Sequence, residues 1–107
     1  MVVDQQVGRI FHALADGTRR DIVRRVVDGE WSVSALARQY PMSFAAVQKH
    51  VAVLERAELV TKERRGREQL VHANLSTVRR AAEVLEQLEE IWCGRLARFE
   101  DVLGTPR

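Results

Sequence analysis

The spacing of apolar residues changes within one short stretch, residues 43–73, and this change limits the chain to few architectures. Val47, Val51 and Leu54 recur at the three- and four-residue intervals of a helix. Ser43 suits the N-cap of that helix because its hydroxyl can accept a hydrogen bond from a first-turn N–H. The sequence therefore predicts a helix that starts at Ser43, is apolar on one face and is followed by a strand-like segment.

The polar face of this predicted helix carries short, donor-rich side chains and no acidic residue. Gln48 is the main candidate for reading bases, because its amide can bond to N7 and N6 of adenine together. Ser43 and Ala45 can approach base edges or a thymine methyl, and Lys49 can reach guanine or phosphate. These residues predict a helix that enters the major groove of duplex DNA.

A basic hairpin, or wing, is predicted directly after the helix, over about residues 59–73. Leu59-Val60 and Leu70-Val71 flank a turn, residues 62–67, with four positive charges and one negative charge. Gly66 supplies the bend, and the candidates for contacts with phosphates or the minor groove are Lys62, Arg64, Arg65 and Arg67. A single arginine is more often a solvated surface charge, but a cluster favours a wing that grips DNA beside the helix.

A short helix and a turn are predicted just before the recognition helix. Ser34 or Ser32 can cap a helix that runs to Tyr40. Pro41 stops that helix because proline lacks an N–H and disfavours helix in the preceding residue. Residues of about 33–57 are therefore predicted to form a helix-turn-helix.

Two further helices are predicted upstream, which with the last helix makes about five. The first has an apolar face formed by Val7, Ile10, Phe11 and Leu14. The second runs from Thr18, behind the cap Asp16, to about Asp28, and Gly29 ends it. Its expected inward residues are Ile22, Val23, Val26 and Val27. Arg19 and Arg20, near its start, are candidates for clamping the DNA backbone.

The last predicted helix, about residues 75–103, carries one long apolar and aromatic stripe. The stripe consists of Val78, Ala82, Leu85, Leu88, Trp92, Leu96, Phe99 and Leu103. It exceeds what the core of a 107-residue chain can absorb from one terminal helix. Packing within one chain is the alternative, but we expect a homodimer with Phe11, Leu85, Leu88, Trp92, Leu96 and Phe99 in its interface. A two-fold axis would place two recognition helices about one DNA turn, ~34 Å, apart.

Composition fits one small domain, residues 1–107, and excludes several classes. Residues 1–73 hold 12 Lys/Arg against 9 Asp/Glu, whereas residues 74–107 hold 5 against 6. The excess positive charge therefore lies in the predicted DNA-binding part. No apolar run approaches the length of a membrane span, and the first residues lack a signal-peptide core. With a single cysteine and thus no internal disulfide, the chain is predicted to be cytoplasmic, with no membrane partner.

Three blocks occur in order: LADGTRRDIV at 14–23, VSALARQYPMSFAAVQKHVAVLERAELV at 33–60 and GREQLV at 66–71. Together they resemble the ArsR/SmtB family of winged helix-turn-helix transcriptional repressors. The resemblance implies a mainly α fold with a two-stranded β-hairpin wing, dimeric through the first and last helices. It also implies a sequence-specific repressor that binds an inverted-repeat operator. Gly17 departs from the usual proline, and Glu58 from the usual glycine at a helix end that favours positive φ.

The metal ligands of the family are missing where the resemblance would place them. Its metal sensors carry a Cys-x-Cys pair where this chain has Ser34-Ala35-Leu36-Ala37-Arg38, and others use histidine in the last helix, which has none here. His12 and His72 match no ligand spacing. His50 lies where the family's recognition helix commonly has histidine, so it is a candidate for DNA contact or for a hydrogen bond between helices. We expect neither a metal nor a cofactor.

Other functions and the regulatory signal stay open at this point. A winged helix can bind protein or RNA, although a recognition face with Gln48 and Lys49 argues against this. The sequence has no Gly-rich phosphate loop, no Ser/His/Asp spacing and no paired carboxylates, so an enzyme is not expected. The signal could be a small molecule, a partner protein, oxidation of Cys93 or the concentration of the protein itself.

Overall fold

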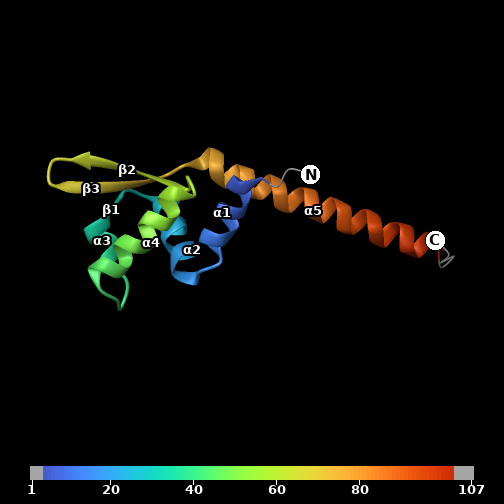
Figure 1. Cartoon of the computed structure of the whole chain (residues 1–107), viewed down its shortest axis with the longest axis horizontal. Coiled ribbons are helices and arrows are strands. Elements are labelled where there is room, and N and C mark those ends of the chain that lie inside the picture. The colour runs from blue at the N-terminus through green and yellow to red at the C-terminus, as the bar shows by residue number, and fades with distance from the viewer. Residues whose placement is uncertain (1–3, 103–107) are drawn as a thin grey trace.

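Five helices and a three-stranded antiparallel sheet make up the computed structural model, which describes residues 4–102 except the side chains of Phe99, Asp101 and Val102. Along the chain they are α1 (Gln5–Leu14), α2 (Gly17–Asp28), β1 (Trp31–Ser32), α3 (Val33–Ala37), α4 (Phe44–Arg56), β2 (Val60–Arg65), β3 (Glu68–Ala73) and α5 (Leu75–Val102). Figure 1 shows the hairpin and α5 pointing in opposite directions from a cluster of helices. The mainly α winged-helix fold is confirmed.

Side-chain caps set the starts of the first four helices. Asp4, Asp16, Ser32 and Ser43 each accept a hydrogen bond from a backbone N–H in the first turn of the following helix. Ser32, rather than Ser34, caps α3, since its hydroxyl accepts from the N–H of Ala35. α3 ends at Ala37, three residues before the predicted end, and the chain reaches Ser43 through turns.

Apolar side chains from α1 to α4 and from the sheet meet in one core. The largest fully buried side chains come from different elements and include Ile10, Ile22, Leu36, Leu54 and Val71. Ile22 and Val26 of α2 face inward as predicted, but Val27 is 47% exposed, so its predicted inward position was wrong. Val27 follows Val26 by about 100° around the helix, which turns it away from the core.

The wing is a β-hairpin with one added strand. β2 and β3 pair from Val60↔Ala73 to Arg65↔Glu68, and Gly66 opens the two-residue loop with a φ of 63°, a backbone conformation that favours glycine. The predicted two-stranded hairpin is present, but β1 pairs with the other edge of β3, so the sheet order is β1-β3-β2. β1 thus joins the middle of β3, at Leu70 and Val71, to the segment before α3.

A tight backbone turn ends α4 and starts the wing. The N–H of Glu58 donates to the carbonyl of Glu55, and the N–H of Leu59 donates to that of Leu54, the pattern of a Schellman motif. Glu58 has a φ of 64° at the position where glycine is usual. Glu58 therefore adopts the left-handed conformation that glycine usually supplies at this helix end, which strains a residue with a side chain.

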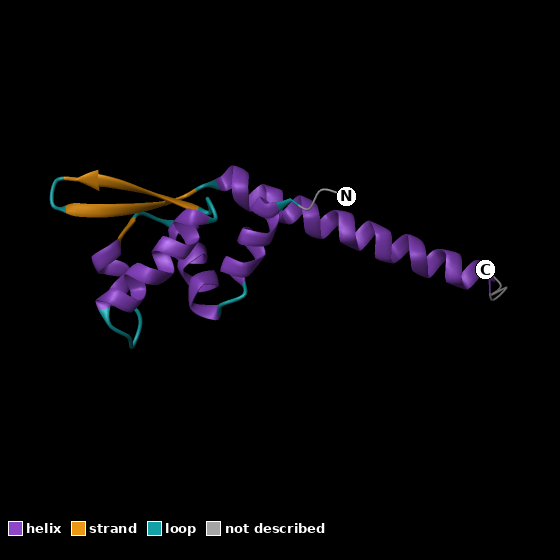
Figure 2. Ribbon diagram, viewed as in Figure 1, coloured by secondary structure: helices purple, strands orange, loops and turns teal. Residues whose placement is uncertain are grey.

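α5 is one continuous helix, but only its first turns pack against the rest of the chain (Figure 2). Its first turns are held against the rest of the chain, where Thr77 and Ala81 are buried. We call residues 4–84 the body and residues 85–102 distal α5. Distal α5 extends away from the body and gives the molecule its long dimension, 66 Å against 30 and 21 Å. None of the described helices is long and apolar enough to cross a membrane.

Candidate nucleic-acid interface

A hollow of about 250 Å³ lies between α4 and the wing. Its polar lining residues are Ser34, Gln48, Lys62, Arg64, Arg67 and Gln69. The fold thus brings the predicted base-reading residue together with three of the four predicted wing cations, although 14 or more positions separate them along the chain. The combination of a helix face and a cationic ribbon is suited to a duplex groove and its flanking phosphates.

Strand alternation divides the wing cations between two faces. Lys62 and Arg64 lie two residues apart on β2, and both line the hollow. Arg65 belongs to the other face, where its guanidinium pairs with Glu30 at 3.5 Å and with Glu63 at 3.4 Å. The structure therefore does not bring Arg65 to the hollow with the other three cations.

The cations of the hollow differ in how free they are. Arg67, in the loop, makes no ion pair or hydrogen bond within the described part of the chain. Arg64 donates only its Nε, to the carbonyl of Gly66 at 3.2 Å. Lys62 lies 3.4 Å from a carboxylate oxygen of Glu55, a partly exposed pair of the kind that contributes little. Most donors of the two arginines are thus available to a ligand.

The start of α4 presents the remaining predicted contacts. The Ser43 hydroxyl accepts a hydrogen bond from the N–H of Ala46 at 3.1 Å, so the side chain caps the helix. Ala45, Gln48 and Lys49 are exposed, and the first turn holds no acidic residue. The positive end of the helix dipole is therefore open to an anionic group.

His50 lies at the contact between α4 and α2 rather than in the hollow. Its Nδ1 is 3.3 Å from Nη1 of Arg19 and 3.9 Å from a carboxylate oxygen of Asp16, and its side chain is 22% exposed. The backbone N–H of Arg19 bonds to Asp16 and is the main cause that holds the pKa of this carboxyl below its usual range. The interhelical alternative for His50 matches this geometry.

Arg19 and Arg20 bind the carbonyls at the end of α1. Arg19 donates its Nε to Ala13 at 2.7 Å and its Nη2 to His12 at 3.2 Å. Arg20 donates to the carbonyls of Leu14 at 2.7 Å and Ala15 at 3.1 Å. These bonds bring charged donors to carbonyls at the end of α1, where the helix itself supplies few N–H partners. Both arginines therefore join α1 to α2, and their contact with the DNA backbone stays a prediction.

A polar cluster supports the turn that precedes α4. Asp21 accepts hydrogen bonds from the Tyr40 hydroxyl at 2.6 Å and from Nε of Arg25 at 2.8 Å, and it also pairs with Arg24. These bonds hold the pKa of Asp21 well below its usual range, while burial and the bond to Asp21 raise the pKa of Tyr40 to about 12. The Arg25 guanidinium lies over the rings of Trp31 and Tyr40.

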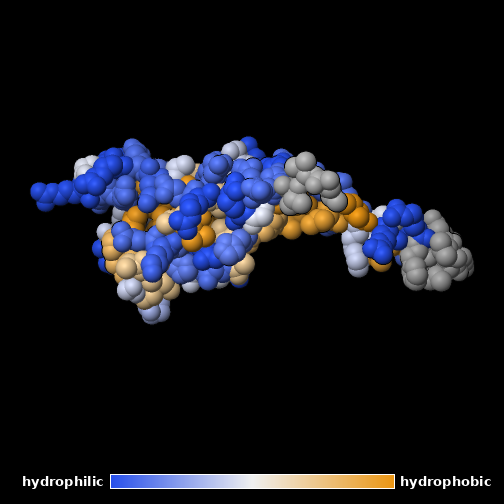
Figure 3. Space-filling model, viewed as in Figure 1, coloured by the Kyte–Doolittle hydropathy of each residue, from blue (hydrophilic) through white to orange (hydrophobic). Residues whose placement is uncertain are grey.

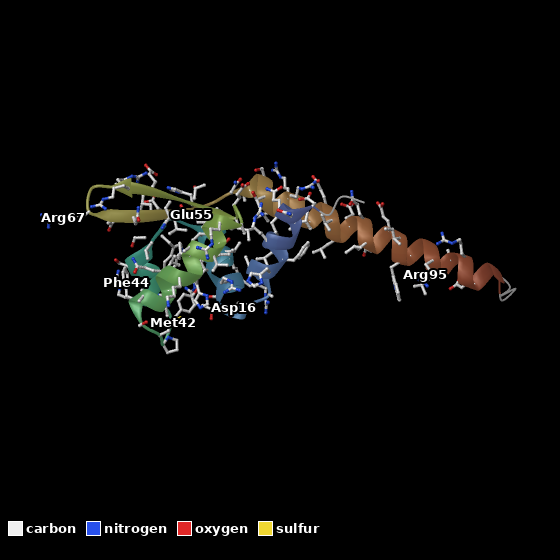
Figure 4. The ribbon with its side chains drawn as sticks, in the orientation of Figure 1. Asp16, Met42, Phe44, Glu55, Arg67 and Arg95 are labelled. Carbon is white, nitrogen blue, oxygen red and sulfur yellow. The ribbon has the colours of Figure 1, made fainter. Side chains whose placement is uncertain are left out.

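Sequence reasoning missed one exposed side chain that lines the hollow. Phe44, the first residue of α4, lines the hollow and is 47% exposed. Figure 4 shows it at the start of α4, toward the same end of the molecule as Arg67 at the wing tip. The available signal was its position four residues before Gln48, which puts both on one face of the helix.

The predicted dimer residues lie mostly in the open. Leu85, Leu88, Trp92 and Leu96 are 55%, 57%, 61% and 47% exposed, so packing within one chain does not account for the stripe. Figure 3 shows apolar side chains gathered along α5 where it leaves the body. Phe11 is partly buried against the core, and the side chain of Phe99 and all of Leu103 lie outside the described residues.

Other features of the described residues are separate from this interface. A hollow of about 610 Å³ between α1 and α4 includes Arg9, His12 and Arg56 but none of the predicted DNA-contacting residues. Within residues 4–102 no group of three His, Cys, Asp or Glu side chains is placed to hold a metal ion. Cys93 is exposed on α5.

Similarity to known proteins was found by sequence and by structure. A family model described as a helix-turn-helix domain matches residues 14–63. The HTH-type transcriptional regulator Rv2034 of Mycobacterium tuberculosis is 34% identical over 91% of this chain and 88% of its own length. The transcriptional repressor SdpR of Bacillus subtilis is 27% identical over 66% of this chain and 77% of its own length.

Solved structures agree with these relatives. An ArsR-like transcriptional regulator from Rhodococcus sp. RHA1 superposes with a TM-score of 0.79 at 31% identity, over 92% of each chain. The homodimeric winged helix-turn-helix domain Mb0332 of Mycobacterium bovis superposes with a TM-score of 0.66 at 26% identity, over 84% of this chain and 92% of its own. With the fold described above, these similarities show that the chain belongs to the ArsR-like family of winged helix-turn-helix transcriptional regulators.

Proposed function

We propose that this regulator is a cytoplasmic, homodimeric repressor that binds an inverted-repeat DNA operator. The observation that carries the proposal is the hollow between α4 and the wing. It combines the exposed amide of Gln48 with the guanidinium groups of Arg64 and Arg67, whose donors are largely free. An amide can form hydrogen bonds with base edges and guanidinium groups can bind phosphates. One surface therefore supplies both the sequence-specific and the backbone contacts with DNA.

In this mechanism the N-terminal end of α4 inserts into the major groove. Gln48 pairs with an adenine, and Lys49 reaches guanine or phosphate. The N-terminal dipole of α4 attracts a phosphate near Ser43. The wing follows the adjacent backbone with Lys62, Arg64 and Arg67, while Arg65 lies on the other face of the hairpin, near Glu30 and Glu63.

Distal α5 supports the dimer. Leu88 and Trp92 expose more than half of their surface, and an exposed apolar stripe of this length marks an interaction site. A second copy fits because the stripe can cover itself about a two-fold axis. The similar Mb0332 domain is homodimeric, which supports the same assembly here. Two-fold symmetry in the protein requires two-fold symmetry in the operator.

Repression follows if the bound dimer blocks transcription, in line with the name of the relative SdpR. The relatives are regulators, which supports a protein without enzymatic activity. We further propose that metals are not the signal. Zinc, cadmium, arsenite and copper at micromolar levels should leave operator affinity unchanged, and a stoichiometric metal complex with altered affinity would contradict this.

Selection of binding sites from a randomised duplex pool tests the main proposal. The expected result is an inverted repeat whose half-site centres lie about one helical turn, roughly 10 base pairs, apart. Sedimentation of the complex should give two chains per site. Gln48→Ala should lose about 1–3 kcal/mol of affinity on this operator and little on random DNA. Recovery of no motif, or preferential binding to RNA of the same sequences, would contradict the proposal and favour a different winged-helix role.

A further inference from the structure

Phe44 is a large apolar side chain that is exposed to solvent at the start of α4. As much as 47% of its surface is accessible, whereas Val51, two turns further along the same side of the helix, is buried. Apolar surface is stabilised by removal from water, so this ring is expected to be covered when the interface is occupied.

The surroundings of Phe44 are those of the nucleic-acid interface. Phe44 and Gln48 are one turn apart on the same face, and both line the hollow with the wing cations Arg64 and Arg67. Four residues of helix rise about 6 Å, which is between one and two base-pair steps of about 3.4 Å. A ring at this position therefore reaches a base pair next to, or one beyond, the pair that Gln48 contacts.

The chemistry of the ring limits what it can recognise there. A phenyl group cannot replace the hydrogen bonds of a base edge, but it can pack on an apolar group. Among the four bases, only thymine presents a methyl group in the major groove. From these observations we propose that Phe44 reads the C5-methyl of a thymine, one or two base pairs from the adenine bound by Gln48. This inference rests on the proposed function.

The wing fixes the register of this contact. Arg64 and Arg67 contribute from the opposite wall of the hollow, so phosphates held there position the duplex against the start of α4. A methyl contact then discriminates thymine from cytosine at one pair of each half-site. Together, Phe44 and Gln48 predict a core of A·T pairs in the half-site.

Methyl removal tests the inference directly. In the selected operator, each thymine is replaced in turn by deoxyuridine, which lacks the methyl but keeps every hydrogen-bonding group. Binding is measured for the wild type, for Phe44→Ala and for Val27→Ala. Val27 is a matched control because it is also 47% exposed but lies on α2, outside the lining of the hollow.

One thymine per half-site is expected to be sensitive. Loss of its methyl should weaken wild-type binding about fourfold, the effect of one buried methyl-sized group. Val27→Ala should show the same loss, whereas Phe44→Ala should bind the thymine and deoxyuridine duplexes equally. Placing 5-methylcytosine opposite guanine at that pair should bind better than cytosine in the wild type and show no advantage in Phe44→Ala.

Two results would overturn the inference. One is a wild type that is insensitive at every thymine, and the other is a Phe44→Ala variant that keeps the full deoxyuridine effect. Failure of the proposed function looks different, since in that case the wild type selects no operator to substitute.

Discussion

The body and distal α5 differ in where their apolar side chains lie. In the body, residues such as Ile10, Ile22 and Leu54 are fully buried by other parts of the same chain. In distal α5, Leu88 and Trp92 remain more than half exposed. The body therefore holds its fold within one chain, whereas distal α5 presents a surface that a second chain can cover. Under the proposed function, the comparison assigns DNA contact to the body and most of the dimer contact to distal α5.

The largest expected effect comes from placing a charge on the stripe. Leu88→Glu or Trp92→Glu should give a monomer, because a carboxylate buried without a partner costs several kcal/mol. Loss of the second half-site should lower operator affinity by a factor of about 10³ or more, toward non-specific binding. Sedimentation and operator titration measure both.

Ala97→Glu is the matched control for this change. Ala97 is exposed and lies on the side of α5 away from Leu88, so the same carboxylate should leave the dimer intact. The circular dichroism of all three variants should show a folded body. Dimeric, operator-binding Leu88→Glu and Trp92→Glu proteins would mean that the chains meet elsewhere.

The next effect concerns the two faces of the wing. Replacing Arg64 and Arg67 by Ala should weaken binding to every DNA sequence and flatten its salt dependence. The slope of log K against log salt changes by about 0.9 for each lost phosphate contact. Arg65→Ala should change the slope little, because strand alternation places Arg65 on the face of β2 that is turned away from the hollow. If Arg65→Ala changed the slope as much as loss of Arg64 or Arg67, the two faces of the wing would not differ in their contact with DNA.

A smaller effect should appear in the stability of the body at low pH. The hydrogen bonds to Asp21 depress its folded pKa, so their stabilisation is present above the unfolded value, about 4, and is lost as the pH falls toward the folded value. Asp21→Asn should lower the free energy of unfolding at pH 7 by about 1–3 kcal/mol, as for hydrogen bonds to a charged group.

Denaturant unfolding from pH 7 to pH 3 distinguishes this cause from general acid effects. The difference between Asp21→Asn and the wild type should shrink below about pH 4, because the Asp21 carboxyl then binds a proton in the unfolded chain while it stays ionised in the folded one. A difference that stays constant with pH would show that the charge of Asp21 does not stabilise the fold.

The smallest effect is expected at the end of α4. Glu58→Gly should raise the free energy of unfolding by about 1 kcal/mol. Relief of the positive φ contributes about 1–2 kcal/mol, and loss of the hydrogen bond from Gln6 to Glu58 offsets part of this gain. Glu58→Ala keeps the strain and is the control. Greater stability of Glu58→Ala than of Glu58→Gly would contradict the explanation. These substitutions are best compared in the Leu88→Glu background, because unfolding of a monomer does not include the free energy of dimer dissociation.

The sequence by itself determined the features that neighbouring residues set. Ser43 and Asp16 cap helices because a side chain and an N–H three residues on are always within reach. Gly66 marked the hairpin turn, and Glu58 marked a strained helix end, through local backbone preferences. The exposed polar face of α4, with Gln48 and Lys49, followed from the helical spacing of its apolar residues.

Tertiary structure alone decided the contacts between distant segments. It placed β1 beside β3, paired Arg65 with Glu30, bound Arg19 and Arg20 to the end of α1, and set Phe44 opposite the wing. A charged or aromatic side chain has several possible partners along the chain, and its local sequence does not rank them. Which partner it meets depends on how the elements pack, because packing sets the distances between groups that are far apart in sequence.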